Sequence, residues 1–177
     1  MKASTSAQAR VARSRSAANK YLTFVLGSEH YGLPILKVQE IIGILDITPV
    51  PRMPAHVRGV VNLRGKVIPV IDLRLRFGIE AQADSKRTCI VVVQIRPAAG
   101  ADPVTLGMVV DVVSEVQDIP ADQIEPAPAF GTTVDTAYIL GVGKIAKRVV
   151  ILLDIDHVLT SSEVATACET APAATKP

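Results

Sequence analysis

The stretch GVVNLRGKVIPVIDL, residues 59–73, places two runs of branched apolar residues on either side of Arg64 and Gly65. Branched side chains favour strands, and two such runs separated by a two-residue turn with glycine predict a β-hairpin. Pro69 has no backbone N–H, so it predicts a sheet edge or a bulge in the second strand. Arg64 at the hairpin tip can serve as a turn residue, a phosphate ligand, a catalytic group or a surface contact, and the function of the chain depends on which.

Short apolar runs bounded by turn residues continue on both sides of this hairpin. The pattern predicts further strands at residues 21–26, 31–35, 88–95, 104–113, 137–143 and 148–153. Helix signals are few: residues 72–78 and 154–163 each begin with an aspartate that suits a helix N-cap. We therefore expect a mainly β protein of barrel type, with short helices and a short C-terminal helix.

Two segments of the first half recur without gaps in the second half: YGLPILKVQEI (31–41) on LGMVVDVVSEV (106–116), and GVVNLRGKVIPVIDL on GVGKIAKRVVILLDI (141–155). The segments keep their order, so chance similarity is a poor explanation. We expect two similar small barrels related by a pseudo-two-fold repeat. The first would cover about residues 19–83 and the second about 84–157, with an exchange of strands between them left open.

The repeat separates residues that the fold needs from residues that it leaves free. Asp72 recurs as Asp154, so helix capping explains both, and Gly65 is expected to serve the turn. Arg64 does not recur, because Ala146 occupies the matching position. The barrel therefore closes without this arginine, which is available for contact with another molecule.

Composition limits the class of protein. The chain has 177 residues and is 49 % hydrophobic, yet no apolar run approaches the roughly 20 residues of a membrane helix. We expect residues 1–18 to be a disordered basic tail, residues 164–177 a disordered tail, and residues 19–163 one ordered unit. Cys89 and Cys168 show no spacing pattern, which is typical of free thiols in a reducing cytosol.

Motifs for catalysis, cofactors or nucleic acids are incomplete. Asp154 and Asp156 in VVILLDIDHV resemble the strand end of haloacid-dehalogenase-type phosphohydrolases, an alternative that needs a large α/β domain after the motif. The histidines and cysteines have no ligand spacing, so no metal site or cofactor is expected. Aromatic residues make up 3 % of the chain, too few for stacking on nucleic acids. We expect a non-enzymatic protein that recognises other proteins.

Five segments together resemble the CheW-like family of chemotaxis coupling proteins, over about residues 20–163: YGLPILKVQEI, ITPVPRMPAHVRGVVNLRGKVIPVIDLRLRFG, GMVVDVVSEV, QIEPAPAF and YILGVGKIAKRVVILLDIDHVL. The resemblance implies two five-stranded SH3-like barrels and a non-catalytic adaptor. Such an adaptor couples methyl-accepting chemoreceptors to the histidine kinase CheA. It would be cytoplasmic and recruited to membrane receptor arrays through protein contacts, without membrane insertion.

The resemblance also implies a binding site. In the family, the helical tip of the receptor lies in an apolar groove between the barrels, and the matching positions here are Ile35, Val38, Glu40, Ile41, Asn62 and Arg64. Met53 and Gly59 would lie near the first-barrel surface that meets the CheA regulatory domain, and ring assemblies of CheW-like domains are expected. Glu115 matches Glu40 in the repeat, so part of the role of Glu40 is structural. A coupler of a pilus or surface-sensing pathway is the alternative function.

Overall fold

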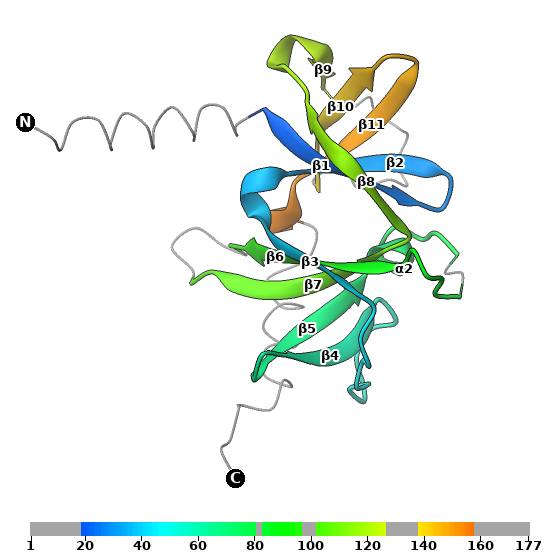
Figure 1. Ribbon diagram of the computed structural model, residues 1–177, viewed down its shortest axis with the longest axis vertical. Coiled ribbons are helices and arrows are strands. Elements are labelled where there is room, and N and C mark those ends of the chain that lie inside the picture. Colours follow the sequence, from blue (N-terminus) through cyan, green and yellow to red (C-terminus); the bar gives the residue numbers. More distant parts are fainter. Residues whose placement is uncertain (1–18, 81–82, 97–101, 127–137, 158–177) are drawn as a thin grey trace, which may run out of the picture.

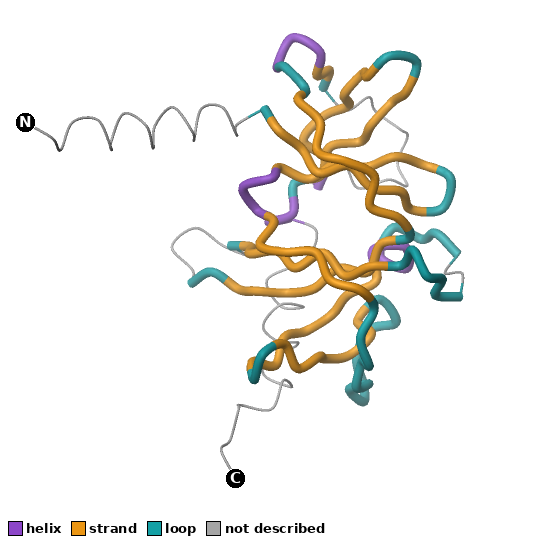
Figure 2. Tube along the Cα trace, in the orientation of Figure 1, coloured by secondary structure: helices purple, strands orange, loops and turns teal. Residues whose placement is uncertain are grey.

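The computed structural model describes residues 19–80, 83–96, 102–126 and 138–157, whose strands form two sheets, one above the other in Figure 1. The tails expected at residues 1–18 and 164–177 lie outside these ranges, as does most of the helix expected at 154–163. Strands and connecting loops dominate the trace, and helices occur only as short turns between strands in the described ranges (Figure 2). None of these short helices is long and apolar enough to span a membrane.

The two sheets differ by one strand. The order in the five-stranded sheet is β3 (Val38–Gly43), β6 (Cys89–Ile95), β7 (Val104–Val110), β5 (Lys66–Asp72), β4 (Val57–Leu63). The order in the six-stranded sheet is β8 (Val112–Asp118), β1 (Lys20–Leu26), β2 (Glu29–Pro34), β11 (Arg148–Leu153), β10 (Ile139–Ile145), β9 (Ile124–Glu125). Short helical turns connect them: η1 (Ile35–Lys37), α2 (Leu73–Arg76), η2 (Ala121–Gln123) and η4 (Ile155–His157). The mainly β, two-barrel prediction is confirmed, with the two-residue strand β9 added to one sheet.

The chain crosses between the sheets twice, so the sheets do not follow the contiguous division near residue 83. It leaves the six-stranded sheet at η1, after β2, and returns to it at Asp111, between β7 and β8. The run 104–113, predicted as one strand, is therefore two strands in different sheets. Asp111 stabilises the chain where it passes from one sheet to the other. Its N–H donates to the carbonyl of Val25 at 3.2 Å, and its Oδ2 accepts the N–H of Gly27 at 2.7 Å.

Strand exchange between the two halves is symmetric. Strand β2 pairs in parallel with β11, with Gly32 opposite Leu152, and β7 pairs in parallel with β5, with Gly107 opposite Val70. The sequence repeat carries Gly32 onto Gly107 and Val70 onto Leu152, so these are equivalent pairings. A Cβ atom at Gly32 would lie 2.9 Å from Leu152, and one at Gly107 would lie 2.7 Å from Ile90. Glycine is required at both positions because a side chain from the neighbouring strand occupies the space.

The largest apolar core lies between the sheets rather than inside either one. Side chains from both sheets contribute to it, among them Leu22, Phe24 and Leu33 from the six-stranded sheet and Val91, Val93 and Met108 from the five-stranded sheet. A run of stacked rings crosses this core, with neighbouring ring centroids 6.1, 5.6 and 5.1 Å apart: Phe24, Tyr31, Phe77, Tyr138. Burial on this scale fixes the two barrels against each other, because each fully buried aliphatic or phenyl side chain contributes about 1.5–3 kcal/mol.

Pro69 does not lie at a sheet edge, the first of its two predicted places, but the pairing of β4 with β5 shifts register between Val57 and Gly59, so a bulge lies close to it. Strand β5 lies between β4 and β7, and Pro69 faces Val60 of β4. The parallel pairing with β7 begins only at Val70. Pro69 is accommodated in an interior strand because it precedes the ladder in which its missing N–H would be needed.

Candidate functional site

Arg64 lies at the exposed tip of the β4–β5 hairpin. Leu63 pairs with Lys66, so the turn consists of Arg64 and Gly65 alone, and both have positive φ, 54° and 82°. Positive φ at both central residues is typical of a type I′ turn, which matches the twist of the flanking strands. The Gly65 N–H donates to Oδ1 of Asn62 at 2.9 Å, which fixes the turn. The Arg64 side chain is 76 % exposed, so it lies on the surface and is accessible to a partner.

The guanidinium of Arg64 is held by a carboxylate on the opposite side of the barrel opening. Its Nη2 lies 2.6 Å from Oε2 of Glu40, on the edge strand β3. A register shift between Val38 and Glu40 in the pairing with β6 marks a bulge at Gln39, just before this carboxylate. The pair lines a hollow of about 340 Å³ with Gln39, Leu63, Lys66, Ile68, Gln94 and Thr105. Such a charge-assisted bond orients the guanidinium while leaving its other N–H groups free for a partner.

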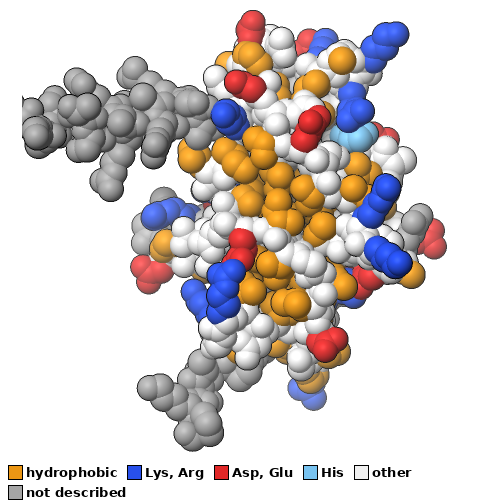
Figure 3. Space-filling model, in the orientation of Figure 1, with side chains coloured by type: hydrophobic (Ala, Val, Ile, Leu, Met, Phe, Trp, Pro, Cys, Tyr) orange, Lys and Arg blue, Asp and Glu red, His pale blue; other side chains and the backbone are white. Residues whose placement is uncertain are grey.

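The other predicted receptor-contacting residues divide between core and surface. Ile35 and Val38 are half-buried and pack against the core between the sheets, whereas Ile41 is 44 % exposed. Asn62 is exposed, but its side-chain oxygen serves the hairpin turn. Figure 3 shows apolar side chains gathered across the middle of one face, where the edge strand β8 and the connection into β3 lie in Figure 1. Ile41, Arg64 and Glu40 thus offer apolar and charged groups on one barrel.

The two residues predicted to lie near the kinase-binding surface, Met53 and Gly59, differ in burial. Met53 is half-buried in the proline-rich connection between β3 and β4, but Gly59 is fully buried. A Cβ atom at Gly59 would lie 2.0 Å from the carbonyl oxygen of Thr48, and φ there is 143°. Thr48 and Val60 exchange two backbone hydrogen bonds of 2.9 Å across this position. Gly59 therefore has a structural role, because it lets the connection close onto β4.

Asp72 and Asp154, predicted as equivalent caps, have different partners. Asp72 is the N-cap of α2, and its Oδ1 accepts the Arg74 N–H at 3.0 Å. It also binds the buried Arg74 guanidinium, whose Nη2 lies 2.8 Å from Oδ2 of Asp72. Asp154 Oδ2 instead lies 2.7 Å from Nδ1 of His157. The backbone is nevertheless equivalent, since the N–H of Asp72 donates to the His56 carbonyl and that of Asp154 to the Tyr138 carbonyl.

The carboxylates of the phosphohydrolase alternative are both occupied by structural contacts. Asp154 binds the His157 ring, and Asp156 accepts a bond from Lys37 Nζ at 2.9 Å and another from the Arg96 N–H at 2.8 Å. Among the described residues, no group of three or more histidine, cysteine or acidic residues could hold a metal ion.

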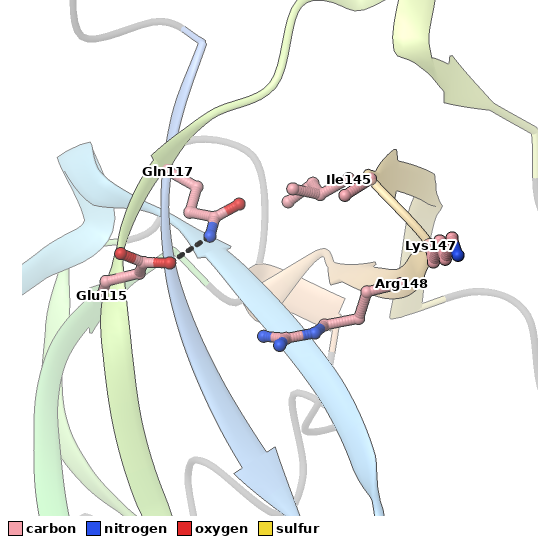
Figure 4. A pocket seen from close by; sticks show the side chains of 6 residues that line it. Glu115, Gln117, Ile145, Lys147 and Arg148 are labelled. Carbon is pink, nitrogen blue, oxygen red and sulfur yellow. Dashed lines mark hydrogen bonds between the residues drawn. The ribbon is translucent and has the colours of Figure 1, made fainter.

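A second hollow, of about 640 Å³, occupies the equivalent opening of the other barrel (Figure 4). It lies between Glu115 and Gln117 of β8 and the tip of the β10–β11 hairpin, which is formed by Ala146 and Lys147. Glu115 accepts a hydrogen bond from the Gln117 amide, and within the described ranges no ion pair joins it to Arg148. This opening lacks the ion pair that spans the first one.

The sequence did not single out Arg74, although its charge is as deeply buried as that of Asp72. Its side chain is 2 % exposed and contacts Asp72, Asp84 at 3.5 Å and Asp111 at 2.7 Å. Hydrogen bonding to Asp72, and then to Asp111, outweighs desolvation and raises the pKa of Arg74. The only sequence signal was its place directly after Asp72 and Leu73, at the end of the repeated segment.

Comparison with known proteins gives one family. Residues 20–163 match the profile of the CheW-like domain. The chain is 40 % identical over 146 residues to chemotaxis protein CheW of Klebsiella aerogenes, which spans 82 % of this chain and 84 % of that protein. It is 36 % identical over 141 residues to chemotaxis protein CheW of Helicobacter pylori, covering 79 % and 81 %. The crystal structure of the scaffolding protein TtCheW from Thermoanaerobacter tengcongensis is similar with a TM-score of 0.72 at 37 % identity, covering 82 % of this chain and 90 % of that one.

Proposed function

The chain belongs to the CheW-like domain family, and from this membership we propose that it is a non-catalytic adaptor. It couples methyl-accepting chemoreceptors to the histidine kinase CheA in bacterial chemotaxis arrays. It works in the cytoplasm and reaches the membrane through protein contacts. The observation in the structure that supports the proposal is the exposed Arg64 guanidinium, held 2.6 Å from Glu40 on the edge strand β3, which also carries the exposed Ile41.

The receptor would bind as a helix laid along an apolar surface. A helix in a groove buries apolar anchors at i, i+3, i+4 and i+7, and Ile41 and the neighbouring exposed Leu36 present apolar groups for such anchors. Arg64 would donate its free N–H groups to receptor carboxylates or carbonyls. Because Glu40 already orients the guanidinium, less conformational entropy is lost when a partner binds. The arginine thus fixes the register of the helix, and the apolar contacts supply affinity.

The CheA regulatory domain would bind around the proline-rich connection that carries Met53. Gly59 contributes there indirectly, because its missing side chain allows this connection to pack onto β4. Ring assemblies with CheW-like domains would make each contact one of many, so individually weak contacts suffice in an array. Receptor signals would then change the arrangement of the kinase that the assembly favours.

Reconstitution tests this proposal. CheA activity is measured with receptor-containing membranes, with and without the protein, and we expect receptor-controlled kinase activity only when the protein is present. Arg64→Ala should reduce that activity, and Arg148→Ala, at the equivalent opening of the other barrel, is the matched control. Unchanged kinase activity on addition of the wild-type protein would contradict the proposal. Turnover of a phosphate ester by the protein alone, lost in Asp154→Asn, would favour the phosphohydrolase instead.

A further inference from the structure

Each of the two connections that cross between the sheets is joined to both sheets by a carboxylate. At the second connection, Asp111 Oδ1 binds Arg74 of α2 at 2.7 Å, and Oδ2 accepts the N–H of Gly27 in the β1–β2 turn at 2.7 Å. Helix α2 follows the five-stranded sheet and the β1–β2 turn belongs to the six-stranded one. We call Arg74–Asp111 the buried crossover pair.

At the first connection, the helical turn η1 carries the cation, and the carboxylate lies on a different element, η4. Lys37, the last residue of η1, binds Oδ2 of Asp156 at 2.9 Å, and Oδ1 accepts the N–H of Arg96 at 2.8 Å. Asp156 lies in η4, after strand β11 of the six-stranded sheet, and Arg96 follows β6 of the five-stranded sheet. We call Lys37–Asp156 the exposed crossover pair.

The sequence repeat relates these two pairs with their charges exchanged. Arg74 and Asp156 each directly follow the repeated segments 59–73 and 141–155. Asp111 aligns with Leu36, which is next to Lys37. An ion pair therefore lies at each crossing between the sheets. The residue that follows the repeated segment is the cation, Arg74, in one pair and the anion, Asp156, in the other.

The two pairs differ in burial. The side chains of Arg74 and Asp111 are 2 % and 23 % exposed, and Arg74 is also bound by the buried Asp72. The side chains of Lys37 and Asp156 are 34 % and 24 % exposed. A partly solvated lysine pair is far weaker than a buried arginine held by several carboxylates, because water screens it and competes for its bonds. The exposed crossover pair can therefore break at a lower cost than the buried one.

Lys37 lies between two predicted receptor-contacting residues. Ile35 begins η1, and Val38 begins β3, the strand that carries Glu40. A helix that contacts this segment would displace the backbone to which Lys37 is attached.

We propose that Lys37 and Asp156 are positioning residues that transmit receptor contact at η1 and β3 to the six-stranded sheet, without themselves binding the receptor. This inference rests on the proposed coupling function. Burial alone would raise the pKa of Asp156, but the Arg96 amide and the Lys37 ammonium outweigh it and hold the pKa below its ordinary value. Asp156 is thus ionised at neutral pH and able to pair.

The test separates binding from signal transfer. Lys37→Gln and Asp156→Asn each remove one charge with little change in shape, and Asp156→Asn retains an oxygen for the Arg96 N–H. The matched control is Lys144→Gln, which breaks the exposed Lys144–Glu125 pair of 2.7 Å within the six-stranded sheet. Affinity for receptor-containing membranes and for CheA is measured first, and kinase activity is then measured with all partners at saturation.

We expect both crossover variants to bind each partner within about twofold of wild type, with kinase activation at saturation reduced at least about threefold. The double variant should match the single variants, because each removes the same interaction, and Lys144→Gln should match wild type. Normal activation by both variants, or a loss explained by affinity alone, would overturn the inference. Additive losses in the double variant would also overturn it. Failure of the wild-type protein to couple receptor and kinase would instead reject the proposed function.

Discussion

The two halves of this molecule share a backbone plan and differ in charge. In the first half, the hairpin tip carries Arg64 bound to Glu40, whereas the second half has Ala146 at the tip, and the Glu115 carboxylate accepts a hydrogen bond from the Gln117 amide. Bulges occur at equivalent places in both, opposite β6 and β1. Because both barrels close although only one has this ion pair, barrel closure depends on apolar packing and strand pairing. Arg64 and its pair are additions that a partner can use.

The largest expected effect compares the two crossover pairs. Arg74→Ala would leave Asp72, which is 2 % exposed, as an unpaired buried charge, at a cost of about 3–5 kcal/mol in the free energy of unfolding. Lys37→Ala removes a partly solvated charge and should cost less than about 1 kcal/mol. Urea unfolding of both variants measures the difference. Similar losses would show that the two crossings are equally fixed and would remove the contrast between them.

Equivalent glycines offer a second comparison. Alanine at Gly59 would place its Cβ 2.0 Å from the Thr48 carbonyl at a φ of 143°, whereas alanine at Gly141 would meet Ile124 at 2.7 Å and the Glu125 carbonyl at 2.8 Å. Overpacking costs roughly 1–3 kcal/mol, and we expect Gly59→Ala at or above the upper end and Gly141→Ala below it. Thermal melts of the two variants give the order. A reversed order would mean that the connection near Thr48 moves away easily.

Replacement of Arg64, at the tip of the first hairpin, should affect receptor binding more than folding. Arg64→Ala removes a side chain that is 76 % exposed, so the free energy of unfolding should change by less than about 0.5 kcal/mol. As an interface anchor, it should weaken receptor binding by about 1–3 kcal/mol. Arg148→Ala on the other barrel should leave receptor binding unchanged. A large fall in the melting temperature of Arg64→Ala with normal receptor binding would contradict the role of Arg64 as an interface anchor.

The smallest expected effect is on the pH dependence of the free energy of unfolding in acid. Hydrogen bonding to Arg58 lowers the pKa of Asp84, and the pKa of Asp156 is also lowered. Carboxylates with a lower pKa in the folded state stabilise it fully above the unfolded value near 3.9, and this contribution disappears as pH falls through the folded value. Asp84→Asn and Asp156→Asn should each make the loss of stability below about pH 4 less steep. Urea midpoints across the acid range measure the slope, and an unchanged slope would contradict the assignment.

Local sequence patterns predicted much of this fold. The hairpin 59–73 and its repeat gave strands at the observed places, because alternation of branched side chains and a two-residue turn are local properties. The run 104–113 was predicted as one strand, since nothing in its apolar pattern marks the crossing at Asp111. The adaptor function followed from the family resemblance, and the receptor-site residues, Arg64 among them, remain predictions.

The mainly β class, the duplication and the lack of an Arg64 counterpart in the second half can all be recognised from the order of residues alone. Which strands share a sheet, the burial of Gly59, and the pairing of Arg74 and Lys37 with their carboxylates became known from the folded structure. Turn chemistry and side-chain alternation act over a few residues and can be recognised along the chain. Strand exchange, and ion pairs between distant residues such as Lys37 and Asp156, depend on which surfaces meet after folding. The residues that neighbour them in the sequence do not indicate these contacts.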